Sequence, residues 1–328
     1  MKKTIALLLA AVLILALAAC GAEKAEEKAA PVDTDTVAVG AVIIARDDVA
    51  EDEIYAFVST IFENIDAITE QHGKGAELNL DFASSVTSVP YHPGAAKYFA
   101  EKGIDVAAVK DGAGAGDVAD LTFGTGGESG TYYAFGGVLS NFVTNSNDFS
   151  VTAVTSGGSK ANIEDMMAGD VQLGFVQSDV MSYAYNGERL FDSALKDFSV
   201  VASLYMEQVQ IVTTNAKIQS VADLEGKKVS IGAVGSGVYF NAIDVLDAYG
   251  LTEDDIKPVY QSFGDSAESL KDGKIDAAFI VAGAPTTAIT DLATAGSVYL
   301  VGFDKEHTDK LLDASPFYSA YTIPAGTY

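Results

Sequence analysis

Runs of β-type residues alternate with helical patterns along most of the chain. The stretch 36–45, TVAVGAVIIA, is rich in β-branched residues, and the acidic segment after it carries apolar residues at helical spacing. This apolar stripe predicts a helix with one face in the core and consists of Ile54, Phe57, Val58, Ile61, Phe62, Ile65 and Ile68. Further β-type runs lie at 150–156, 171–177, 198–205, 208–214, 227–233, 277–283 and 297–303. Strands that alternate with helices predict an α/β fold with mostly parallel sheets.

Three glycine-rich turns follow predicted strands, and each opens a helical pattern. They are LTFGTGGESGTYYAFGG (121–137), VTSGGSKANIEDM (154–166) and IGAVGSGVYFNAIDVL (231–246). A strand, a turn without side chains and a helix N-terminus together present free backbone N–H groups and a positive dipole end to an anion. Single turns of this kind also occur as plain structural connections. Three on one chain indicate one ligand held from several sides.

One supersecondary unit occurs twice, at 162–179 and 257–283. Each copy reads as a helix, a Gly-Asp or Gly-Lys turn, and a buried strand that ends in small polar residues. The repetition predicts two similar lobes. Lobes that face each other place the ends of their strands in a shared cleft, where open α/β sheets bind ligands.

The first 20 residues have the layout of a secretory signal, because Lys2 and Lys3 precede an apolar run that ends in small residues. Residues 17–20, LAAC, resemble the bacterial lipobox, so Cys20 is expected to carry lipid and anchor the protein outside the cytoplasm of a bacterium. Cys20 is the chain's one cysteine, which excludes a disulfide and a thiolate metal site. Residues 21–32 are charged and alanine-rich, as expected of a tether.

The chain holds 46 acidic and 20 basic residues, a formal net charge of −26. This balance argues against nucleic acid as a partner, because phosphate contacts need clustered Lys and Arg. Arg46 and Arg189 are the two arginines, so a bidentate clamp on a carboxylate has few candidates. Backbone N–H groups and hydroxyls are therefore the expected ligands of an anion, which must be attracted locally against the net charge.

Catalytic patterns are missing from the sequence. His72, His92 and His307 are far apart, without metal-ligand spacing, and are expected to be ordinary surface residues. The run GTGGESG lacks the lysine and hydroxyl ending of a P-loop, and no serine lies in a G-x-S-x-G elbow. We therefore predict a protein that is not an enzyme and that uses no cofactor and no metal.

Several of these motifs together resemble the TAXI family, the TRAP-associated extracytoplasmic immunogenic proteins. The matching segments are LTFGTGGESGTYYAFGG, TSGGSKANIEDMMAGDVQLGFVQSDV, SVADLEGKKVSIGAVGSGVYFNA, GKIDAAFIVAG and IPAGTY, which span 121–328. The resemblance implies a two-lobe, periplasmic-binding-protein-like (type II) fold. It also implies capture of a small organic anion of the glutamate, glutamine or 2-oxoglutarate type and delivery to TRAP-type permease subunits. Ligand contacts implied by motif position are Gly126, Gly127, Ser129, Thr131, Tyr132, Ser156, Gly158, Ser159, Gln177, Ser178, Ser236, Gly237, Val238, Ala282 and Gly283.

The order of the segments departs from that family. Segments 36–68 and 91–104 resemble the family's C-terminal part yet precede the glycine-rich loop, which implies a circularly permuted chain. The implied organisation is a signal peptide (1–20), a tether (21–32), a strand returning between the lobes (33–48), lobe 1 (49–110 and 117–204), a linker (111–116) and lobe 2 (205–328). The alternative is a natural rearrangement with a different fold.

Two other functions stay open at this stage. A sensory or ABC-type binding lipoprotein shares the binding fold and differs only in its partner. A surface hydrolase needs a nucleophile or a base in the cleft.

Overall fold

The computed structural model describes residues 32–108, 113–117 and 119–328, and the fold is that of the unit Asp33–Tyr328. The predicted signal peptide, the lipidation site Cys20 and residues 21–31 of the tether lie outside the described residues. Within the described part, no helix combines the length and the apolar character needed to cross a membrane.

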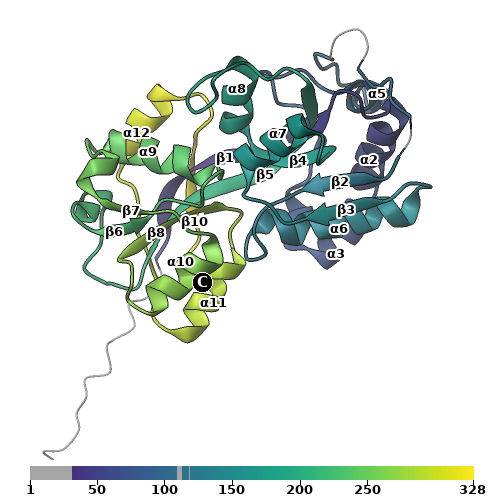
Figure 1. Ribbon diagram of the computed structural model, residues 1–328. Coiled ribbons are helices and arrows are strands. Elements are labelled where there is room, and N and C mark those ends of the chain that lie inside the picture. The colour runs from purple at the N-terminus through teal and green to yellow at the C-terminus, as the bar shows by residue number, and fades with distance from the viewer. Residues whose placement is uncertain (1–31, 109–112, 118) are drawn as a thin grey trace, which may run out of the picture. The chain divides into compact units, whose positions relative to one another are not determined.

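Ten strands of the described residues form one sheet (Figure 1). Its main path runs β3, β2, β4, β1, β5, β8, β6, β7, while β10 pairs with β1 and β9 with β5. The strands are β1 (Thr34–Arg46), β2 (Leu121–Gly124), β3 (Val151–Val154), β4 (Leu173–Gln177), β5 (Phe198–Thr213), β6 (Lys228–Ser230), β7 (Lys257–Val259), β8 (Ala277–Ala282), β9 (Tyr299–Leu300) and β10 (Ser319–Ile323).

The strands β1 and β5 run through both lobes as one antiparallel pair. Their register extends from Ala38 opposite Gln208 to Arg46 opposite Phe198. On its other edge, β1 pairs first with β10 of lobe 2 and then with β4 of lobe 1. The predicted strands at 198–205 and 208–214 are thus a single strand, β5, which crosses the boundary between the lobes.

The prediction of mostly parallel sheets is wrong, because the sheet is mixed. The pairings β2–β3, β2–β4, β6–β7 and β6–β8 are parallel, whereas every pairing of β1 and β5 is antiparallel. Parallel neighbours need crossover helices. The strands β1 and β5 are not part of such units, since they connect the two lobes.

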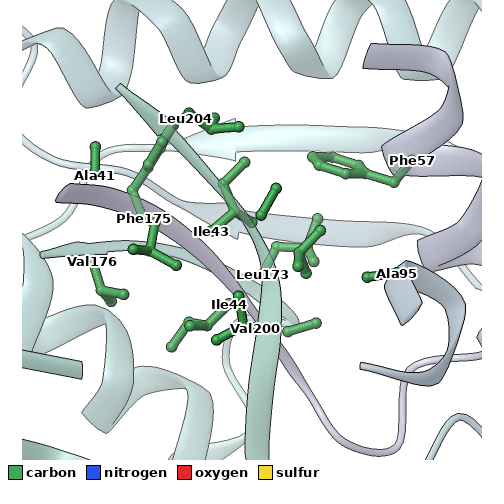
Figure 2. Close-up of a cluster of buried hydrophobic side chains, with 14 of the residues drawn as sticks. Ala41, Ile43, Ile44, Phe57, Ala95, Leu173, Phe175, Val176, Val200 and Leu204 are labelled. Atoms are coloured by element: carbon green, nitrogen blue, oxygen red, sulfur yellow. The ribbon is translucent and has the colours of Figure 1, made fainter. Parts of the chain in front are cut away.

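Helices of lobe 1 cover its part of the sheet. They are α2 (Glu51–Glu63), α3 (Ile65–Gln71), η1 (Gly73–Glu77), α4 (Leu80–Ala83), α5 (Pro93–Glu101), α6 (Thr131–Ser146), α7 (Ser159–Ala168) and α8 (Ser178–Asn186). The predicted apolar stripe lies on α2 and α3 and is buried, except for half-buried Ile65. Figure 2 shows the core, where side chains of β1, β4 and β5 meet Phe57 of α2 and Ala95 of α5.

Lobe 2 has a core on each face of the sheet. Phe279 of β8 belongs to one cluster and the next residue, Ile280, to the other, because successive side chains of a strand point to opposite faces. The covering elements are η2 (Val221–Leu224), α9 (Val238–Ala248), η3 (Glu253–Asp255), α10 (Phe263–Lys271), α11 (Thr287–Ala295) and α12 (Lys305–Ala314).

The two ends of the unit Asp33–Tyr328 lie side by side, since Thr34 of β1 pairs with Ile323 of β10. A permuted order requires such neighbouring ends, and it stays a prediction. The described part of the linker is bonded to the start of α2. Gly114 accepts a hydrogen bond from the Glu51 N–H and donates one to the Asp47 carbonyl, at 2.9 and 2.7 Å.

Truncation of Ile43 tests the core where β1 passes between β4 and β5. Ile43 is fully buried, so Ile43→Ala leaves a cavity and should cost about 2–5 kcal/mol of unfolding free energy. Leu190→Ala is the control, because Leu190 is 52% exposed, and it should change stability by less than about 0.5 kcal/mol. Urea denaturation measures both, and equal losses for the two variants would contradict the central position of β1.

Candidate functional site

A cavity of about 120 Å³ lies at the carboxyl ends of the parallel strands of both lobes. Such strand ends are where open α/β sheets bind ligands. The turns after β2, β3, β6 and β7 contribute most of the wall, β4 and β5 contribute one residue each, and β8 contributes two. The lining residues are Gly126, Gly127, Glu128, Ser129, Gly130, Thr131, Tyr132, Ser156, Gly157, Gly158, Ser159, Gln177, Glu207, Ala233, Ser236, Gly237, Val238, Gln261, Ser262, Phe263, Gly264, Val281 and Ala282.

Four helices, α6, α7, α9 and α10, begin at this cavity. The N-cap residues of the first three are Gly130, Gly158 and Gly237, which have no side chain to accept from the N–H groups of the first turn. By contrast, α10 is capped by Ser262, which accepts from the Asp265 N–H at 3.1 Å. A glycine N-cap leaves backbone donors for water or a ligand. In α7 one of these donors is already used, because the Ala161 N–H donates to the Gly235 carbonyl at 3.0 Å. Three such helix ends, with their positive dipoles, favour a negative group at this wall.

Close approach explains the glycine at the start of α9. A Cβ built on Gly237 would lie 1.7 Å from Gln177 Oε1 and 3.0 Å from Ser159 Oγ, both of which belong to lobe 1. Gly237 therefore lets the N-terminus of α9 reach the end of β4. Gly158 is needed for a different reason, because its φ of 102° lies in the left-handed region.

The side chains of the wall include two acids, Glu128 and Glu207, and neither Lys nor Arg. Glu128 is exposed, whereas Glu207 is 2% exposed. The hydroxyl of Tyr132 donates to Glu207 Oε2 at 2.6 Å. Burial raises the pKa of Glu207 to about 8; nearby Asp179 acts in the same direction, while the Tyr132 hydrogen bond and Lys74 oppose it.

A buried network of hydrogen bonds leads from the cavity across the boundary between the lobes. Gln177 Nε2 donates to Asn241 Oδ1 at 2.9 Å, and Asn241 Nδ2 donates at 2.9 Å to both Asp179 Oδ2 and the Tyr318 hydroxyl. Burial raises the pKa of Asp179 to about 7. Because Gln177 and Asp179 belong to lobe 1 and Asn241 to α9 of lobe 2, these bonds join the lobes.

Phe240 of α9 is a residue of lobe 2 that packs in the core of lobe 1. Its ring is 1% exposed and lies 5.7 Å from the Tyr183 ring and 6.4 Å from the Phe191 ring, between centroids. The Arg189 guanidinium lies 5.5 Å from the Phe240 centroid and donates to Asp244 Oδ1 of α9 at 2.8 Å. An aromatic contact and an ion pair therefore hold α9 against lobe 1.

All but two of the predicted ligand contacts line the cavity. Ser178 instead faces β1, where its Oγ accepts from the Gly40 N–H at 3.1 Å. Gly283 is covered, because its carbonyl accepts from Thr131 Oγ1 at 3.0 Å and Lys74 packs against its Cα. Contact of the other residues with a ligand stays a prediction.

Sequence reasoning missed several residues of the wall, above all Glu207 and the start of α10 at Ser262 and Phe263. The sequence does contain a pattern that indicates the start of α10. Ser262 and Asp265 have the spacing of an N-cap and its acidic partner, directly after a short strand.

The remaining polar candidates lie elsewhere. Arg46 pairs with Asp48 and Arg189 with Asp244, so neither arginine of the chain reaches the cavity. The expectation of a surface position is wrong for His92, which is fully buried as the N-cap of α5 and whose pKa burial lowers to about 4. In the part of the chain that the structure describes, no cluster of three or more acidic, histidine or cysteine side chains is placed to hold a metal.

A protein-family comparison decides the relationship of the chain. The model of the NMT1-like family matches residues 19–103 and 123–328, which is most of the sequence. The chain belongs to the NMT1-like family.

Solved structures with a similar fold include the alkanesulfonate-binding protein of Xanthomonas axonopodis pv. citri bound to MOPS. It is 22% identical over 57% of this chain and 61% of its own, with a TM-score of 0.40. The periplasmic aliphatic sulphonate-binding protein of Escherichia coli is 20% identical over 57% and 60%, with a TM-score of 0.36. A putative L-cystine ABC transporter protein of Listeria monocytogenes is 18% identical over 60% and 90%, with a TM-score of 0.38. This chain spans about three fifths of the length of the two sulfonate-binding proteins.

The family match corrects the resemblance to the TAXI family, which is wrong, and with it the implied TRAP-type permease. Glycine-rich turns at helix starts are features of the two-lobe architecture, so they do not separate one family of that architecture from another. The prediction of an α/β two-lobe, periplasmic-binding-protein-like fold is confirmed, and so is the prediction that the chain is not an enzyme.

Two glycines of the cavity wall provide a matched test of its packing. Gly237→Ala forces Gln177 and Ser159 to move and should cost about 1–3 kcal/mol of unfolding free energy. Gly127→Ala adds the same methyl group where nothing lies within 4 Å, and it should stay within about 0.5 kcal/mol of the parent. Chemical denaturation compares the two, and a tolerated Gly237→Ala would contradict the close contact between α9 and β4.

The buried acids predict a pH dependence of the ligand-free protein. The pKa of Glu207 is raised from 4.5 to about 8, so the native state holds a proton that the unfolded chain has lost. Stability should therefore fall as the pH rises from about 7 to about 8.5, a window above the titration of His92 in either state. Denaturation across this window measures the slope. Glu207→Gln should flatten it, and a slope unchanged in that variant would contradict the assignment.

Proposed function

We propose that the chain is an extracytoplasmic solute-binding protein that captures a small organic anion, a carboxylate or a sulfonate, for a membrane transporter. The observation that carries the proposal is the wall built from three helix N-termini that have a glycine in place of a capping side chain, at Gly130, Gly158 and Gly237. These helix ends concentrate backbone donors and positive dipoles in a cavity with no cationic side chain.

The partner follows from the proposed role. The match to the NMT1-like family argues against a TRAP-type permease, and we propose an ABC-type permease as the recipient of the solute. We also propose that Cys20 anchors the protein by lipid, which places the binding unit at the outer side of a bacterial membrane. The lipobox-like residues 17–20 support this anchor.

The side chains of the cavity wall suit binding of a solute without a catalysed reaction. Its hydroxyls come from Ser, Thr and Tyr residues at helix starts, and no histidine, lysine or cysteine lies beside them in the cavity to act as a base or a nucleophile. An anion that contacts both lobes would be bound more tightly in the closed state than in the open one, and binding would shift the protein toward closure.

A ligand screen tests the proposed function. Calorimetry of the purified protein against L-glutamate, L-glutamine, 2-oxoglutarate, C4-dicarboxylates and alkanesulfonates should give at least one specific ligand. At a free concentration one hundred times its Kd, that ligand should raise the unfolding free energy by about 2.7 kcal/mol. Neutral sugars and simple amines serve as controls. Silence of every carboxylate and sulfonate, with binding of a sugar or an amine, would overturn the anion site.

A further inference from the structure

Glu207 is an ionisable group in the cavity wall that the capture of an anion does not use. It lies on β5 opposite Val39 of β1, at the point where β5 crosses between the lobes. Oε2 accepts from the Tyr132 hydroxyl, while Oε1 has no hydrogen-bond partner among the described residues. The Tyr132 ring itself is fixed by stacking on Phe175 at 4.6 Å between centroids. The carboxyl group is thus held in place with one oxygen left for a ligand.

Among the described residues, no cation forms an ion pair with Glu207. Lys74 is a basic group that lowers its pKa, but the Lys74 ammonium is paired with Glu77 and lies 5.3 Å from the centroid of the Tyr205 ring. Besides Lys74, the groups that act on Glu207 or are acted on by it are Asp179, which adds negative charge, and the hydroxyls of Tyr132 and Tyr205. A buried carboxylate without a positive partner is costly, which is why its pKa is raised.

The Glu207 carboxyl group weakens the binding of an anionic ligand that has no positive group. If Glu207 is ionised, its charge repels the ligand; if it is protonated, the site must hold a proton for as long as the ligand is bound. A ligand that carries an ammonium group avoids both the charge repulsion and the need to hold a proton. Its ammonium supplies the missing positive charge and three N–H donors.

We infer that Glu207 is a specificity-determining residue that binds an ammonium group, so that the solute is a zwitterion whose anionic end lies at the glycine-capped helix starts. The inference rests on the proposed function, because it needs an anion at those helix ends. It narrows the solute to amino carboxylates and amino sulfonates, and Glu207 discriminates against the same acids without the amino group.

Pairs of probes that differ only in the amino group test the inference on the whole protein. The pairs are L-glutamate with glutarate, L-alanine with propionate, and taurine with ethanesulfonate, each titrated by calorimetry at pH 7. The amino member of at least one pair should bind on the order of 30-fold more tightly or better, since an unpaired buried charge is costly. Glu207→Gln should remove most of that preference. Glu268→Gln is the matched control, because Glu268 is exposed on α10 outside the cavity and its loss should leave the preference intact.

Proton exchange gives a second readout that needs no variant. Binding of the ammonium group ionises Glu207, so the parent protein should release close to one proton at pH 7, measured in buffers of different ionisation enthalpy. Acids without the amino group that bind as tightly as their partners, or amino acids that bind with proton uptake, would overturn the inference and leave the anion site standing. Failure of every anion to bind would overturn the proposed function and the inference together.

Discussion

The pairing of β1 with β5 is the constraint on which the two lobes depend. Both strands pass from one lobe to the other, so the hydrogen bonds between them belong to a sheet that is continuous across the whole unit. The register slips twice, between Ala41 and Val42 and between Ile43 and Ile44. Irregular pairing of this kind bends and twists a strand locally. A movement of the lobes relative to each other would therefore have to bend this pair, and separation of the lobes would break the sheet.

The electrostatics of the cavity depend on the backbone more than on side chains. A chain with a net charge of −26 has few cations to place, and those that lie near the cleft are already paired with acids. Helix N-termini supply positive potential without adding a charge that must be desolvated, and glycine caps keep that potential directed at the cavity. The scarcity of cations also leaves Glu207 without a cationic partner among the described residues.

Features of the fold that depend on a local sequence pattern could be predicted from the sequence. Glycine-rich turns at helix starts, the apolar stripe of α2 and α3, and the alternation of strands and helices were all readable, and the cavity walls follow from them. Residues that depend on long-range pairing were not readable. Glu207 and Gln208 interrupt an apolar run, so β5 was divided into two predicted strands, 198–205 and 208–214, with Glu207 of the cavity wall in the gap between them. Ser178 and Gly283 were misplaced because each sits one residue beyond a strand end, where the next turn decides its direction.

The position of Phe240, three residues after Gly237, means that one rigid helix performs two tasks. The first turn of α9 presents backbone donors to the cavity, and the same turn carries an aromatic ring that is seated in the core of lobe 1. A ligand that fits the closed cavity meets a helix already held in place, so less of its binding energy is spent on reorganising the protein. The same arrangement affects the release of a bound solute. An opening of the lobes would expose the apolar surface of Phe240 and break the Arg189 ion pair with Asp244, so it would cost free energy in the protein alone.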